Sequence, residues 1–365
     1  TGLLGRASLE GHVISLIDVE QDDPCVVSVA ISGDGRFLAA RTLERDRGRL
    51  VVWNLKSEQP LLDQRGLRYG LNGRASGMTE FLGSRLLDFS AAGDWLATGQ
   101  LATSQYDVEA WRVPMDPTDL PSTLRCDEQV HSLDFSPVDR RLLVAGRVPP
   151  GTSADSVFEY EDWPDGFSKR SDAVAVWSDR PLRSRVESLQ YSANGRLRAV
   201  ANGAAVRVYV DQRPVGEQIS LGDSRVTCLA FCPVLDSEWL AIGGAGVVEV
   251  FNAVTAERVR QLTSERDGVP GSVGSVAFSP NGRWLLVAGG NHAWNGRGEV
   301  RLYSTVDWSQ RGSLPTDGKL VSSVAISPVV PLAVAGSAEG AIRLWDLRSL
   351  VGPAWQGMNS DDNTR

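Results

Sequence analysis

Short runs of alternating apolar residues recur along the chain, and each run ends in a small residue and a turn. Seven runs are present, at Val27–Ser32, Leu86–Ser90, Ser132–Ser136, Ser188–Ser192, Cys228–Cys232, Ser275–Ser279 and Ser323–Ser327. A turn containing Gly, Asp, Asn or Pro follows each run, and a second apolar run comes after most of these turns. The period-two alternation predicts β-strands rather than helices. The runs lie on average about 49 residues apart, a spacing that suits one four-stranded sheet per repeat.

A third predicted strand follows each pair and ends on an aromatic residue. These residues are Trp53, Trp111, Trp177, Tyr209, Phe251, Tyr303 and Trp345. The first strand of each repeat sets a larger apolar residue against a small one, which suits a sheet covered on both faces. One repeat could not bury both of its faces, whereas seven stacked around an axis could. The pattern therefore predicts an all-β fold in which the repeats form one unit.

The repeats resemble those of the WD-repeat family of β-propellers over residues 26–347. Trp345-Asp346 matches the dipeptide that names the family, and it follows Gly340-Ala-Ile-Arg-Leu344. Other repeats depart from it, as at Trp53-Asn54 and Trp111-Arg112, and the Gly-His pair that usually opens a repeat is missing. The family's His–Ser–Asp–Trp hydrogen-bond set is therefore incomplete here. The resemblance implies a seven-bladed β-propeller of four-stranded antiparallel blades.

We expect residues 1–350 to form this single propeller, with blades that start near residues 27, 85, 130, 186, 226, 273 and 321. The seventh repeat lacks a fourth strand after Trp345, whereas residues 11–19 precede the first repeat with nowhere else to pair. We therefore predict that residues 11–19 supply the outer strand of blade seven and close the ring, which leaves no unpaired end blade. Residues 351–365 are expected to be a polar, disordered tail that includes Trp355.

Five insertions distinguish the repeats, at residues 42–48, 62–84, 101–107, 147–172 and 291–298. In the family's geometry, connections from the second to the third strand emerge on the same face as connections between blades. All five insertions map to that face. Loops on a rigid scaffold commonly carry binding. We therefore predict a non-catalytic protein-interaction module, a scaffold or recognition subunit of a larger assembly, that binds through the insertion-rich face.

The insertion in blade three alternates aromatic and acidic residues. Its aromatic residues could anchor a partner and its carboxylates could attract a basic one; they are Phe158, Tyr160, Trp163 and Phe167, with Glu159, Glu161, Asp162 and Asp165. The alternative is a loop that packs its rings onto the propeller rim. Trp294 in blade six has the same two interpretations. Elsewhere on this face, phosphate or carboxylate groups could contact Arg65, Arg68 and Arg74, or these arginines are simply solvated.

Asp88, Asp134 and Gln190 occupy one shared position in the first strands of three consecutive repeats, where the other four repeats carry alanine. If this position faces the central channel, the three side chains could bind a cation, a small ligand or a basic side chain. This is the rival hypothesis, an enzymatic or ligand-binding propeller. Alternatively, each side chain bonds a neighbouring backbone N–H or an arginine.

Composition narrows the remaining classes. The 45 acidic residues outnumber the 37 basic ones, and the formal net charge of −8 argues against a general nucleic-acid binder. No apolar run approaches the ~18 residues of a membrane-spanning helix, and no signal peptide is visible. The three histidines fall in separate repeats, and no catalytic Ser-His-Asp order or phosphate-binding loop occurs. We therefore expect no cofactor, no metal and no membrane contact.

Four scattered cysteines make no disulfide framework and favour a reducing cytoplasm. The first residue is Thr1 rather than Met, so one interpretation is a segment of a longer protein. Most of the eleven tryptophans end third strands or begin second strands. Trp163 and Trp294 do neither, and they sharpen the interest in the two long loops that carry them.

Overall fold

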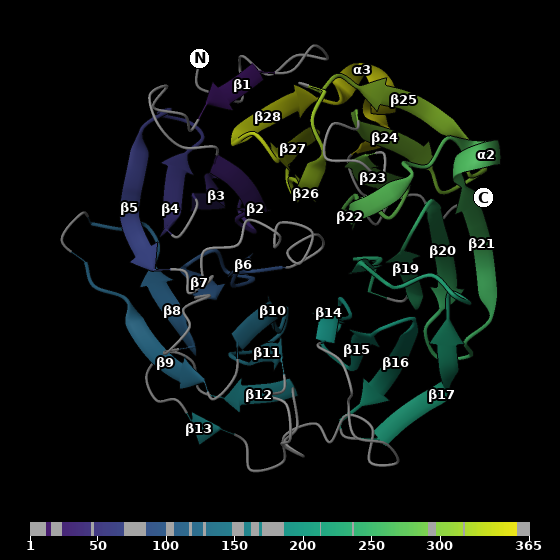
Figure 1. The fold of residues 1–365 in the computed structure, drawn as a ribbon, viewed down its shortest axis with the longest axis horizontal. Coiled ribbons are helices and arrows are strands. Elements are labelled where there is room, and N and C mark those ends of the chain that lie inside the picture. Colours follow the sequence, from purple (N-terminus) through teal and green to yellow (C-terminus); the bar gives the residue numbers. More distant parts are fainter. Residues whose placement is uncertain are drawn as a thin grey trace, which may run out of the picture.

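Seven four-stranded antiparallel sheets stand around a central axis in the computed structural model (Figure 1). The structure describes residues 12–15, 24–44, 47–68, 85–99, 106–116, 119–126, 129–147, 157–161, 168–169, 186–211, 213–235, 237–290, 297–316 and 318–355. The fold is a seven-bladed β-propeller, and the predicted fold class is confirmed. We number the blades one to seven in chain order of their first strands.

The first three blades contain β2 (Pro24–Ile31), β3 (Phe37–Glu44), β4 (Arg47–Asn54) and β5 (Pro60–Arg68), then β6 (Leu87–Phe89), β7 (Trp95–Gly99), β8 (Tyr106–Arg112) and β9 (Ser122–Cys126), then β10 (Gln129–Phe135), β11 (Leu142–Arg147), β12 (Val157–Glu161) and β13 (Ser168–Lys169). Blades four and five contain β14 (Val186–Tyr191), β15 (Leu197–Asn202), β16 (Ala205–Val210) and β17 (Arg213–Ser220), then β18 (Cys228–Phe231), β19 (Trp239–Gly243), β20 (Val247–Asn252) and β21 (Arg258–Thr263).

Blade six contains β22 (Ser272–Phe278), β23 (Trp284–Gly290), β24 (Gly298–Ser304) and β25 (Gln310–Leu314), and blade seven contains β26 (Val321–Ile326), β27 (Leu332–Ser337), β28 (Ala341–Asp346) and β1 (His12–Ser15). Helical structure is limited, in the described residues, to α2 (Ser264–Asp267), α3 (Arg348–Val351) and the 3₁₀ turn η2 (Gly352–Trp355).

The serine that ends each repeated run stabilises the turn that follows it. In blade one, the Ser32 hydroxyl donates to Asp34 at 2.6 Å and accepts the Phe37 N–H at 3.0 Å. Gly35 in this turn has a φ of 68°, a conformation that favours glycine. The same Ser-to-N–H bond recurs in blades two, four and six, at 2.9–3.0 Å. The repeated sequence phrase is therefore a repeated turn.

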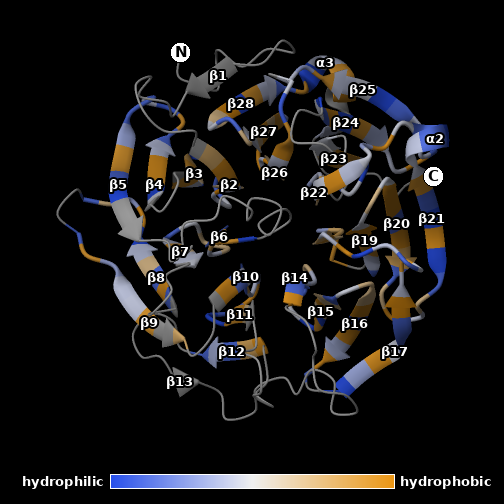
Figure 2. Cartoon of the chain, in the orientation of Figure 1, coloured by the Kyte–Doolittle hydropathy of each residue, from blue (hydrophilic) through white to orange (hydrophobic). Residues whose placement is uncertain are grey.

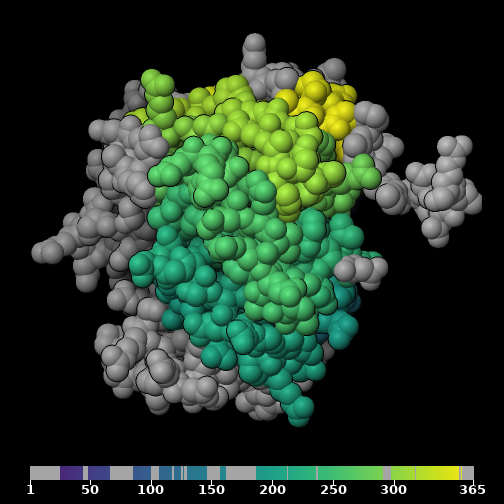
Figure 3. Space-filling model, turned by 90° about the vertical axis from the view of Figure 1, so that its right-hand side faces the viewer, coloured from purple at the N-terminus to yellow at the C-terminus, as the bar shows by residue number. Residues whose placement is uncertain are grey.

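The apolar core consists of one cluster of buried side chains between each pair of neighbouring blades, seven clusters among the described residues. The second and third strands are buried on both faces, whereas the outermost strands β17 and β21 are mostly exposed. Figure 2 shows this gradient as polar colour on the outer strands. Viewed from the rim, blades four to six follow one another in chain order (Figure 3). Each blade thus depends on its neighbours for burial.

Strand β1 closes the ring, as predicted. It pairs antiparallel with β28, from His12 opposite Leu344 to Ser15 opposite Ala341. Blade seven therefore takes one strand from the start of the chain and three from its end.

The third strand of blade three differs from the prediction. It is β12, which pairs with β11 and lies within the predicted insertion at 147–172, whereas the predicted strand that ends at Trp177 lies outside the described residues. Two other predicted insertions are partly strand: β3 and β4 extend their hairpin across most of 42–48, and β5 continues to Arg68. In each case strand pairing with a neighbour extends further than the local sequence pattern indicates.

Residues 351–355, predicted to belong to a disordered tail, are ordered in the structure. Residues 348–355 form α3 and η2, and the Trp355 side chain is 6% exposed in the cluster between blades six and seven. Its carbonyl oxygen accepts a hydrogen bond from the Asn281 Nδ2 at 3.2 Å. Burial of the Trp355 ring between two blades therefore orders residues that the polar composition of the C-terminal segment predicts to be disordered.

Removal of residues 1–20 tests the closure of the ring. The shortened chain loses the four residue pairs between β1 and β28, and at ~0.2–1 kcal/mol per pair we expect it to unfold with a free energy lower by about 1–4 kcal/mol. Thermal and urea unfolding of both chains measure the difference. Identical transitions would contradict the structural role of β1.

Candidate functional site

Asp88, Asp134 and Gln190 each point a side-chain oxygen at the next blade. Asp88 accepts the Phe135 N–H at 2.7 Å, and Asp134 accepts the Tyr191 N–H at 2.7 Å. In the same way, the Gln190 oxygen accepts the N–H of Phe231 at 2.6 Å. The shared sequence position therefore joins first strands of consecutive blades.

Arg85 supplies the positive charge between the two carboxylates. Its guanidinium lies 2.7 Å from Asp88 and 2.6 Å from Asp134, and its side chain is about one-third exposed. Sequence reasoning missed this residue, because it precedes the strand and belongs to no repeated motif. A cation-binding role for the two aspartates is thus already filled by an arginine of the same chain.

One arginine cannot neutralise two carboxylates. Burial, and the neighbouring Asp88 carboxylate, raise the pKa of Asp134 to about 8, although Arg85 and the Tyr191 N–H favour its charged form. A proton on Asp134 lowers the negative charge that Arg85 has to balance. This protonation state suits a buried structural contact.

A second buried ion cluster joins blade three to blade four. Glu159 on β12 accepts two hydrogen bonds from Arg198, at 2.9 and 2.7 Å, and one from the Tyr191 hydroxyl at 2.5 Å. Arg141 also lies 3.3 Å from the same carboxylate oxygen. Burial, and then the Glu159 charge, raise the pKa of Tyr191 above its usual range, so this hydroxyl stays a donor. Removing one partner of such a cluster leaves an uncompensated buried charge.

The structure packs Phe158, Tyr160 and Glu159 inside the ring, which matches the alternative interpretation of this insertion. Phe158 and Tyr160 are 8% and 4% exposed and pack in the cluster between blades two and three. They alternate along β12 with Val157 and Glu159, which face blade four. The alternation of aromatic and acidic residues reflects a strand with two buried faces, one of which contains a neutralised carboxylate.

The other predicted contact residues are mostly not placed. Trp163, Phe167, Trp294 and Arg74 lie outside the described residues, as does the side chain of Arg68. Arg65 on β5 is exposed and lies 3.7 Å from Asp63. The insertion-rich face therefore stays a prediction from the positions of its connections.

The ring has two ends. The end with the long connections between second and third strands is the insertion face. The end with the turns between first and second strands is the turn face. Turns between third and fourth strands share the turn face, since the Leu55 N–H bonds the Arg36 carbonyl and the Ala253 N–H bonds the Glu238 carbonyl. Of the seven large apolar side chains that are exposed in the described part of the chain, six lie on the turn face: Leu120, Val138, Val234, Leu235, Val306 and Val329. Sequence reasoning did not single out any of them.

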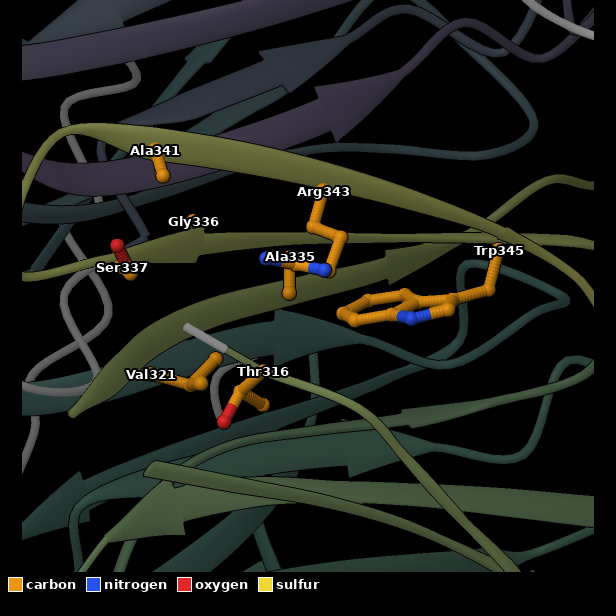
Figure 4. Close-up of a pocket in the computed structure, with 8 residues that line it drawn as sticks. All are labelled: Thr316, Val321, Ala335, Gly336, Ser337, Ala341, Arg343 and Trp345. Atoms are coloured by element: carbon orange, nitrogen blue, oxygen red, sulfur yellow. The ribbon is translucent and has the colours of Figure 1, made fainter. Parts of the chain in front are cut away.

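A small cavity lies beside Trp345, between blades six and seven (Figure 4). Thr316, Val321 and Ala335 line it, and with a volume of about 10 Å³ it has room for no more than a water molecule. The buried Trp345 Nε1 has no hydrogen-bond partner among the described residues, nor have those of Trp111 and Trp284. The family's hydrogen-bond set is thus incomplete at these indoles, as the missing Gly-His pairs indicate.

Within the described ranges, no group of three or more His, Cys, Asp or Glu side chains could hold a metal ion. No helix in that part of the chain has the length and apolar character that a membrane crossing requires.

Comparison with known protein families finds two matches among the repeats. The family model "WD domain, G-beta repeat" matches residues 259–297 and 305–346. The second match starts just before β25 and ends at Asp346 in β28, so a repeat spans the last strand of one blade and three strands of the next. This offset is the reason that blade seven needs β1. Two stretches of this seven-bladed β-propeller thus match WD repeats, in blades five to seven.

A solved structure has the same fold. The crystal structure of the β-propeller domain of Cps50 (Swd1) from Myceliophteria thermophila superposes with a TM-score of 0.65 over 92% of this chain and 99% of that one, at 13% sequence identity. At this identity the likeness shows the fold alone. No curated protein matches the sequence.

The raised pKa of Asp134 predicts a pH-dependent stability. Between pH 4 and 8 the folded state retains a proton that an unfolded aspartate, with a pKa of about 3.9, has lost. The free energy of unfolding should therefore fall as pH rises through this window, by up to about 1.4 kcal/mol per pH unit from this group. Asp134→Asn should remove that contribution. Urea unfolding from pH 4 to 8 measures it, with exposed Asp223→Asn as the matched control; equal slopes in both variants would contradict the assignment.

Proposed function

We propose that this protein is a non-catalytic interaction module that binds another protein through its insertion face, as a scaffold or recognition subunit. The observation that carries the proposal is the concentration of long connections at one end of a rigid ring. These connections are residues 69–84, 100–105, 148–156, 170–185 and 291–297. The hairpin connections at the same end of blades four, five and seven are only short turns, such as residues 203–204.

The two longest of these connections flank blades two and three. Residues 69–84 join blade one to blade two, and residues 170–185 join blade three to blade four. Loops that a rigid scaffold carries commonly serve binding. The degenerate WD repeats support the same function, since this fold generally presents surfaces to other proteins.

The contacts of Asp88 and Asp134 favour this function over a ligand-binding one. The carboxylate oxygens of Asp88 and Asp134 accept backbone N–H groups of the next blade and form ion pairs with Arg85. A reducing, cytoplasmic location is part of the proposal, and the four cysteines, none of them in a disulfide, support it.

Replacement of the two longest connections tests the proposed face. One variant carries a Gly/Ser linker of equal length at residues 70–83, and a second variant carries one at residues 171–184. We expect each to lose its protein partners by at least about tenfold, because interface energy concentrates in a few anchor residues. Affinity capture from the native host, with quantitative mass spectrometry, measures the loss.

The matched control is a variant with Val138→Ser and Val329→Ser, two exposed positions on the turn face. It should retain the same partners as the parent chain. Melting curves of all variants confirm that the ring is intact. Capture of an unchanged set of proteins by both linker variants would contradict the proposal.

A further inference from the structure

We propose that the turn face at blade five is a second docking site, and that it binds a short acidic peptide segment with an apolar anchor residue. This site lies at the opposite end of the ring from the insertion face and does not depend on the function proposed for that face. Three observations carry it: a rigid apolar turn, two flanking arginines and a contact between the C-terminal segment and the adjacent turn.

The apolar turn consists of Pro233, Val234 and Leu235, three consecutive exposed residues. Val234 and Leu235 are 39% and 64% exposed. Blade six holds the turn on one side, since a Cβ on Gly282 would lie only 2.8 Å from the Val234 Cγ2. Blade four holds it on the other, where Asn194 donates to the Leu235 carbonyl at 3.5 Å. Exposed apolar side chains that neighbouring blades hold in place suit the anchor of a partner.

Two exposed arginines flank this turn. Arg283 directly follows Gly282, on which Val234 packs, and Arg196 lies two residues after Asn194. Neither has an acidic partner among the described residues. Equivalent arginines differ: Arg36 pairs with Asp34 at 2.6 Å in blade one.

Two unpaired guanidinium groups on either side of an apolar turn are complementary to carboxylates beside an apolar residue. The chemistry of the flanking groups therefore selects an acidic segment rather than a basic one.

The C-terminal segment of this chain contacts the adjacent turn of blade six. Trp355 is buried against blades six and seven, and its carbonyl accepts the Asn281 side-chain N–H at 3.2 Å. Asn281 and Gly282 are consecutive, so this contact is continuous with the blade-five turn through Val234. An aromatic anchor with a captured carbonyl thus occupies one turn, and the adjacent turn offers apolar surface and positive charge.

Selection from a phage-displayed random peptide library against the whole chain tests the proposal. We expect the enriched peptides to place Leu, Phe or Trp beside Asp or Glu. Titration of these peptides, labelled with fluorescein, should show an affinity lower by about tenfold or more for Val234→Ser/Leu235→Ser and for Arg196→Glu/Arg283→Glu. Added salt should weaken binding to the parent chain, because exposed charges are screened.

Val329→Ser is the matched control. Val329 occupies the corresponding Pro-Val turn of blade seven and packs on Gly35, but the neighbouring Arg36 is already paired with Asp34. This variant should bind the peptides as the parent does.

Equal binding by the parent and the Val234→Ser/Leu235→Ser variant, or recovery of no binding peptide, would overturn the proposal. Peptides that are lost only when residues 171–184 are replaced would also overturn it, while supporting the function proposed for the insertion face. The two proposals therefore fail separately.

Discussion

The first strand of every blade has one edge that no strand of its own sheet covers, and side chains of the preceding blade accept hydrogen bonds from several N–H groups on that edge. A buried donor without an acceptor costs about 1–3 kcal/mol. The acceptors are side chains of the first strands themselves: Asp88, Asp134, Gln190, Ser132, Ser275 and Ser323. Their bonds set the spacing between neighbouring first strands, and the apolar clusters between blades fill the space that this spacing defines.

Around blade three, ion pairs add to these hydrogen bonds between blades; we call the contacts between neighbouring first strands the seam. Arg85 links the acceptors of blades two and three, and Arg198 of blade four reaches back to Glu159. Both ion clusters lie where long connections interrupt the regular repeat. The longest connections of the insertion face therefore lie next to the blades whose contacts are the most polar. The turn face, at the other end of the ring, carries exposed apolar residues on rigid turns.

Much of this fold is predictable from the sequence, because alternation at period two and a serine-capped turn recur in each repeat. The closing strand follows from a missing fourth strand after Trp345. The third strand of blade three was not predictable, since burial of Glu159 depends on Arg198, 39 residues away. The sequence shows that Asp88, Asp134 and Gln190 share one position in the repeat. It does not show their partners, because these are backbone N–H groups, which every residue type except proline carries. The exposed valines escaped notice because isolated apolar residues in turns are common.

Hydrogen exchange of single backbone amides tests the seam most directly. The amides of Phe135 and Tyr191 face an aspartate of the preceding blade, whereas the corresponding amides of Phe278 and Ile326 face an alanine, Ala230 and Ala277. We expect exchange at Phe135 and Tyr191 to be as slow as in the strand ladders, and exchange at Phe278 and Ile326 to be faster. Equal rates at all four amides would contradict it.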